Sequence, residues 1–213
     1  MKIIGIPTEQ TTALTDFILG LLLVGILYVL YQRRGSLKVT IWLYALGLLC
    51  FASFLGAYAH GIEMSADLNY WLWQPLNLAL GLVIGMFVVA TCLDIWGAGV
   101  VRRVLIFMIV VAVIFYGVTV AIPGTFMTFV AYEAVAMLFA LGGYLYLALK
   151  KGQGSAWWMV AGIFITIVAA AIQAVGTSGV VMFWGLDHNG VFHLVQMFGL
   201  LALTAGVVTS LKK

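Results

Sequence analysis

Histidine and glutamate residues inside apolar runs are the groups of this chain that could do metal chemistry. His60, Glu133 and His193 lie within or at the edge of such runs, where an ionisable side chain is costly and usually faces a bundle interior or a water cavity. Zn²⁺ binds imidazole nitrogens and carboxylate oxygens, and a catalytic zinc site keeps one position for water. Zinc would turn that water into a nucleophile. These residues predict a zinc site, with His188 as a further candidate ligand.

Other polar side chains share helix faces with the histidines. Asn189, His193 and Gln196 are spaced four and three residues apart, which places them on one face of a helix. Ser53 lies two turns before His60 and shares its face. The remaining polar residues within apolar runs are Gln74, Asn77 and Gln173.

The elements that must position these residues are membrane-spanning helices. Hydrophobic residues make up 65% of the 213 residues and charged residues 8%, whereas a soluble domain has about 25% charged residues. A membrane span takes about 20 apolar residues, and the chain contains seven such runs. We therefore predict an all-α membrane protein, a single seven-helix transmembrane domain over residues 1–213. The predicted spans are 13–32, 39–61, 72–95, 102–122, 126–149, 156–176 and 189–210.

The basic residues predict how these spans are oriented. Every Lys and Arg except Lys2 falls on one side of the seven-span arrangement, and basic loops stay in the cytoplasm. We expect the N-terminus outside and the C-terminus in the cytoplasm, in a bacterial inner (plasma) membrane. Asp94, beside the cytoplasmic boundary, is expected to pair with Arg102 or Arg103, or to snorkel. The net charge of +3 does not indicate a nucleic-acid partner.

The polar residues also agree in depth. Counted inward from the outer helix ends, Glu133 and Asn77 lie about 8–11 Å inside and His193 about 6 Å, while His60 and Gln173 lie in the outermost turn. We expect these side chains to converge on a site in the outer half of the bundle. The alternative is that each of these polar side chains only forms a hydrogen bond between two helices and takes no part in a site. Asp187 is expected to cap the seventh helix, and the apolar piece 180–184 either extends the sixth helix or lies at the membrane interface.

Three segments resemble a known superfamily. The seven spans, the His that closes the second helix and the segment Asp187-His188-Asn189-Gly190-Val191-Phe192-His193 resemble alkaline ceramidases and adiponectin-receptor-like proteins. Ala-Ala-Ile-Gln at 170–173 and His193-Leu194-Val195-Gln196 are similar to an uncharacterised, mostly bacterial branch near them. The resemblance implies hydrolysis of lipid amides with zinc held by one His of the second helix and two of the seventh.

The resemblance implies His60 and His193 as ligands, and the chain departs from the pattern elsewhere. Gly56 stands where the superfamily has a Ser one turn before the second-helix His. Asn189 stands where it has the first seventh-helix His, with His188 displaced by one. Its third-helix Asp has no clear counterpart, and Gln74 and Asn77 are nearest.

Three functional interpretations remain open at this point. A metal-dependent lipid hydrolase would use His60 and His193 as zinc ligands, with Glu133 or His188 completing the site. Ser53 and Asn77 would then orient the substrate carbonyl or the oxyanion. The alternative is a non-enzymatic protein that binds a membrane lipid or small molecule in the same cavity. A haem between His60 and His193 is a third interpretation, and retinal is excluded because no span interior contains a Lys.

Overall fold

The computed structural model describes residues 2–122, 127–177 and 179–212, and these residues form seven long α-helices with one short 3₁₀ turn. All seven are long and apolar enough to cross a membrane, which confirms the predicted all-helical class and the seven predicted spans. The helices are α1 (Pro7–Tyr31), α2 (Leu37–Gly61), α3 (Ala66–Trp96), α4 (Val101–Ala121), α5 (Met127–Leu149), α6 (Gly154–Val175) and α7 (His188–Ser210), and the turn η1 (Ala98–Val100) precedes α4.

Two helices begin about a turn and a half before the predicted spans. Pro7 occupies the first turn of α1, where its fixed φ suits a helix and its missing N–H costs nothing. Ser65 caps α3 by accepting a hydrogen bond from the Leu68 N–H. Both first turns are polar, so hydropathy alone placed the starts too late. The extra turns of α1 carry residues of the site described below.

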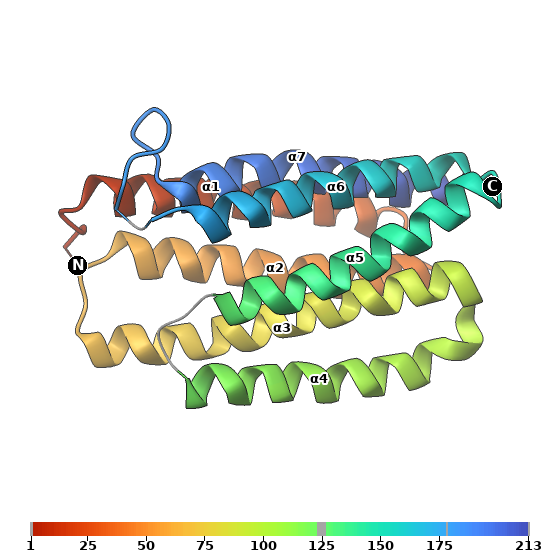
Figure 1. Ribbon diagram of the computed structural model, residues 1–213, viewed down its shortest axis with the longest axis horizontal. Coiled ribbons are helices and arrows are strands. Elements are labelled where there is room, and N and C mark those ends of the chain that lie inside the picture. Colours follow the sequence, from red (N-terminus) through yellow and green to blue (C-terminus); the bar gives the residue numbers. More distant parts are fainter. Residues whose placement is uncertain (1, 123–126, 178, 213) are drawn as a thin grey trace.

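Six of the helices form a closed ring. Packing runs in the order α1, α2, α3, α5, α6, α7 and back to α1, and α4 lies outside, mainly against α3 (Figure 1). The tightest seam joins α6 to α7, where a Cβ at Gly162 would come within 2.6 Å of Leu203 Cγ. Small residues allow such close approach between helices in a membrane. The N-terminus lies at one end of the bundle and the C-terminus at the other, and we name the two ends accordingly.

A polar cluster ties four helices together at the C-terminal end. Lys38 of α2 forms an ion pair of 2.7 Å with Asp94 of α3 and donates a hydrogen bond to Ser210 of α7. The Tyr144 hydroxyl of α5 donates to Asp94 at 2.9 Å. The expected partners of Asp94 were therefore wrong. Arg102 and Arg103 point outward at the start of α4, whereas Lys38 at the start of α2 reaches into the seam beside α3.

The apolar piece 180–184 does not extend the sixth helix, because α6 ends at Val175. The chain turns back on itself where Phe183 bridges to Leu186, and this loop projects from the N-terminal end of the bundle in Figure 1. Its apolar side chains are exposed, Trp184 by 90%. A place at the membrane interface remains the prediction for this loop.

Candidate functional site

A long cavity of about 400 Å³ runs inside the ring of six helices, and each of the six contributes to its wall. At the N-terminal end it begins among His60, Gly176 and His188, and toward the C-terminal end it reaches Trp42 and Leu203. Along α2 alone, the interval from Trp42 to His60 corresponds to about 27 Å of helix. The cavity is therefore narrow for its length.

The wall changes character along this length. Toward the C-terminal end it is formed by apolar and aromatic side chains, among them Leu46, Phe87 and Leu203. Toward the N-terminal end it carries the acids, the histidines and the amides. The cavity thus has a polar section at one end and an apolar section at the other, as sites for amphipathic ligands do.

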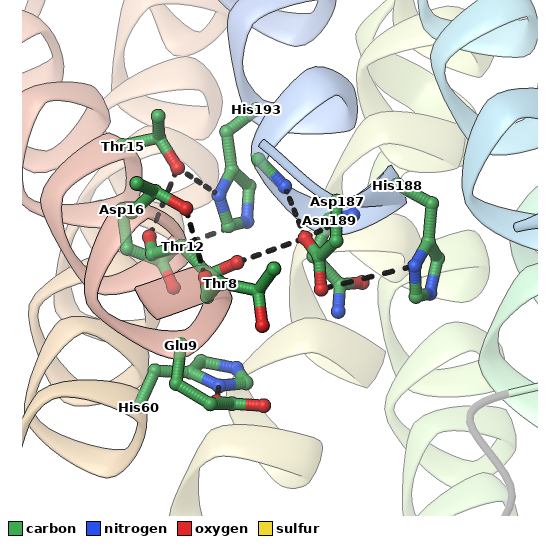
Figure 2. A network of polar contacts seen from close by, with 12 residues as sticks. Thr8, Glu9, Thr12, Thr15, Asp16, His60, Asp187, His188, Asn189 and His193 are labelled. Carbon is green, nitrogen blue, oxygen red and sulfur yellow. Dashed lines mark hydrogen bonds and ion pairs between the residues drawn. The ribbon is translucent and has the colours of Figure 1, made fainter. Parts of the chain in front are cut away.

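The polar section is built around a buried His–Asp pair between α1 and α7. Asp16 Oδ1 lies 3.2 Å from His193 Nε2, and the Thr15 hydroxyl lies 3.0 Å from His193 Nδ1 (Figure 2). The Thr15 hydroxyl proton is donated to the Thr12 carbonyl at 2.9 Å, so the Thr15 oxygen accepts from Nδ1. Nε2 faces the Asp16 carboxylate at ion-pair distance. A carboxylate beside an imidazole is less costly to bury than an unpaired charge.

A second His–carboxylate pair stands nearer the end of the bundle. His60 Nδ1 of α2 lies 2.6 Å from Glu9 Oε2 of α1, and the edge of the His60 ring meets Trp73 of α3 at 5.6 Å between centroids. Both side chains are partly buried. This contact holds His60 toward α1 and occupies its Nδ1.

Asp187 fixes the start of α7 against α1. Its Oδ1 accepts hydrogen bonds from the backbone N–H groups of Asn189 and Gly190, and another from the Thr12 hydroxyl at 3.0 Å. The side chain is only 1% exposed. These contacts confirm the predicted helix cap, and they also set the height of α7 relative to α1, which brings His193 level with Asp16.

Several buried polar atoms along the cavity have no hydrogen-bond partner among the residues that the structure describes. Buried polar groups are normally paired, so each exception points to a ligand, a water or an ion. Gln196 illustrates the pattern: the Thr166 hydroxyl donates to the Gly162 carbonyl, so the Gln196 group 3.3 Å from it must be the NH₂ donor. The Gln196 carbonyl oxygen is thereby left without a donor. The unpartnered atoms on the cavity wall are Trp42 Nε1, Glu133 Oε2, Gln173 Oε1, His188 Nδ1 and Gln196 Oε1.

The cavity gathers most of the candidate residues named from the sequence. Gln173 donates to Asn189 Oδ1 at 3.2 Å, joining α6 to α7 beside the cavity. Gln74 and Asn77 of α3 are not among the described residues that line it, and the Gln74 amide donates to its own helix at the Tyr70 carbonyl. The predicted residues on the wall are Ser53, His60, Glu133, Gln173, His188, Asn189, His193 and Gln196.

The predicted zinc ligands do not form a ligand set within the described parts of the chain. No group of three or more His, Cys, Asp or Glu side chains there has an arrangement that could hold a metal ion. Both ring nitrogens of His193 and Nδ1 of His60 are occupied by protein partners. Zinc binding through His60, His193, His188 and Glu133 stays a prediction.

The contribution of α1 was missing from the sequence-based site. Thr8, Thr12, Thr15 and Asp16 are all buried, and Asp16 and Thr15 hold His193. The signal was present as a stripe: these residues recur at intervals of three and four, which marks one helix face. It was overlooked although Thr15 and Asp16 lie in the first turn of the predicted span 13–32, because the rest of the stripe precedes that span.

Comparison with known proteins gives a family. The chain matches no curated protein and no solved structure, and the resemblance to ceramidases remains a prediction. A model of a family of unknown function, DUF6962, matches residues 11–212, which includes all the helices except the first residues of α1. The chain belongs to this family, DUF6962.

Proposed function

We propose that this protein binds a single-chain amphiphile of the membrane inside the helix ring and does not hydrolyse it. The observation that carries the proposal is the set of unpartnered polar atoms on the wall of a long, otherwise apolar cavity. A buried polar group without a partner costs about 1–3 kcal/mol. A ligand whose polar group meets the unpartnered atoms at the N-terminal end of the cavity, a group that excludes Trp42 Nε1, recovers part of that free energy, and its alkyl chain covers the apolar section.

The dimensions of the cavity favour a ligand with a single alkyl chain. A volume of about 400 Å³ lies in the lower part of the range of about 300–1,000 Å³ found for sites that hold small molecules. The cavity extends along most of the membrane-spanning length of α2, from His60 to Trp42. A slender, elongated molecule suits this shape, and a whole two-chain phospholipid does not.

Ligand binding explains the residues of the cavity wall better than hydrolysis does. A hydrolase would need a nucleophile and oxyanion donors at one point of the wall, and Asn77, one of the two groups expected to orient the substrate, does not line the cavity. His60 and His193 are held by Glu9 and Asp16. We place the polar end of the site in the outer half of the membrane, on the basis of the Lys and Arg distribution.

The test is native mass spectrometry of the protein released from nanodiscs, with two matched variants on α2. Leu49 lines the cavity and is partly buried, whereas Phe51 is 49% exposed on the lipid-facing side. Leu49→Trp fills the cavity and should abolish an amphiphile adduct of the wild-type protein. Phe51→Trp places a tryptophan on the lipid-facing side of the same helix, so the amphiphile adduct should remain.

Two results would overturn the proposal. One is the absence of any adduct after incubation with single-chain amphiphiles. The other is an adduct that Leu49→Trp leaves unchanged, because a ligand in the cavity cannot coexist with the added ring. Release of a cleaved product by the wild-type protein would support the hydrolase interpretation instead.

A further inference from the structure

Glu133 differs from the other buried acids of the described chain. It is 5% exposed, and its Oε2 has no hydrogen-bond partner. Asp16 is paired with His193, and Asp187 is held by two backbone N–H groups and the Thr12 hydroxyl. Only Glu133, among the buried acids in the part of the chain that the structure describes, lacks such partners. Its carboxyl group faces the cavity.

The wall around Glu133 offers no compensating positive charge. None of the described residues that line the cavity is Lys or Arg. Among the histidines, His193 already faces Asp16 and His60 already faces Glu9, and His188 lies 3.9 Å from Asp187. An anionic head group would therefore meet unpaired acid and no cation. Burying an unpaired charge in an apolar medium is very costly, so this wall selects against anions.

The hydrogen-bonding pattern of the cavity wall also disfavours an anionic ligand. Gln196 presents its carbonyl oxygen to the cavity, because its NH₂ group is committed to Thr166. Glu133 lies about 9 Å along α5 from the first residue of that helix, and Gln196 about 12 Å along α7 from His188. Both helices run from the N-terminal side of the bundle toward its C-terminal end, and both residues line the same cavity. A ligand group that meets the Gln196 oxygen and an ionised Glu133 must be a hydrogen-bond donor.

We infer that the ligand is a lipophilic amine, whose ammonium group binds Glu133 and Gln196 and whose alkyl chain extends toward Trp42. An ammonium group has three donors and no acceptor, which matches two acceptor oxygens in a wall without cations. Its charge also balances the Glu133 carboxylate. This inference rests on the proposed function, because it names the chemical class of the ligand in the same cavity.

The test compares three ligands with the same chain: tetradecylamine, tetradecanol and tetradecanoic acid. Each is titrated into the full-length protein in nanodiscs of neutral lipid, and binding to Leu49→Trp is subtracted as partition into the bilayer. The amine should bind at least about tenfold more tightly than the alcohol or the acid, equivalent to about 1.4 kcal/mol. This comparison uses the wild-type protein and does not depend on a variant's folding.

Glu133→Gln adds the residue-level test. It keeps the shape of the side chain and removes its charge, so amine affinity should fall at least about tenfold while alcohol affinity stays within about twofold. Glu63→Gln is the matched control, because Glu63 is 40% exposed, pairs with Lys2 and lies outside the cavity. It should leave all three affinities unchanged.

The outcomes separate the two proposals. If the alcohol or the acid binds in the cavity as tightly as the amine, or if Glu133→Gln leaves amine binding unchanged, the inference of an amine is wrong and the binding function stands. If none of the three ligands shows binding that Leu49→Trp removes, the proposed function fails together with the inference.

Discussion

The carboxylate of Asp16 lies against the backbone of Gly56, so closely that a Cβ at position 56 would come within 2.7 Å of Asp16 Oδ2. The contact joins α1 to α2 one turn before His60. The Asp16 carboxylate of α1 occupies the space that a side chain at position 56 would need. The glycine is therefore part of the site, because it lets Asp16 reach His193.

Gly56→Ala should displace the Asp16 carboxylate and weaken the α1–α2 seam. Inserting a methyl group into a well-packed contact costs about 1–3 kcal/mol, and we expect a loss of this size in the free energy of unfolding, measured in mixed micelles. Gly47→Ala on the same helix is the control, because a Cβ there meets nothing within 4 Å. Equal stability of the two variants would show that Asp16 does not depend on Gly56.

Asp187→Ala should destabilise the protein through the start of α7. It removes the acceptor for two backbone N–H groups and for the Thr12 hydroxyl, and loss of a helix cap costs about 0.5–2 kcal/mol. Thr12→Val removes only the link to α1 and should cost less. Hydrogen exchange at the first turn of α7 checks the assignment: protection should drop in Asp187→Ala, and unchanged protection there would contradict the capping role.

The orientation of the bundle can be tested with single cysteines at exposed positions. Arg34 lies at the C-terminal end of the bundle and Asp67 at the N-terminal end, and the native Cys50 and Cys92 are both buried. A membrane-impermeant maleimide added to intact cells should label Asp67→Cys and leave Arg34→Cys unlabelled until the cells are permeabilised. The reverse pattern would invert the orientation predicted from Lys and Arg.

The helices could be predicted from the sequence because one physical quantity, the length of an apolar run, determines them. Glu133, Gln173 and His193 could be assigned to one region for a related reason: helices that cross a membrane share a depth scale, so counting from the helix ends compares residues on different helices. That count is independent of which side chains touch. It places residues at one level without showing which of them face the same cavity.

The partners within the site could not be predicted in this way. Depth did not distinguish Asn77, which lies outside the cavity wall, from Ser53, which lines it, because the difference is a rotation of each helix about its axis. Asp94 pairs with Lys38 and not with the nearer arginines in sequence, because that pairing depends on which helices are neighbours in the ring. Asp16 was missed although it lies in the first turn of the predicted span 13–32, because the rest of its polar stripe precedes that span.

Photo-crosslinking can show whether an amphiphile lies lengthwise in the helix ring. The probes are tetradecylamine and tetradecanol with a diazirine at the chain end, bound to the protein in nanodiscs and mapped by peptide sequencing. We expect crosslinks at Trp42, Leu46 and Leu203 in the apolar section of the cavity, and their loss in Leu49→Trp. Crosslinks confined to lipid-facing residues such as Ile106 and Phe107 of α4 would contradict this expectation.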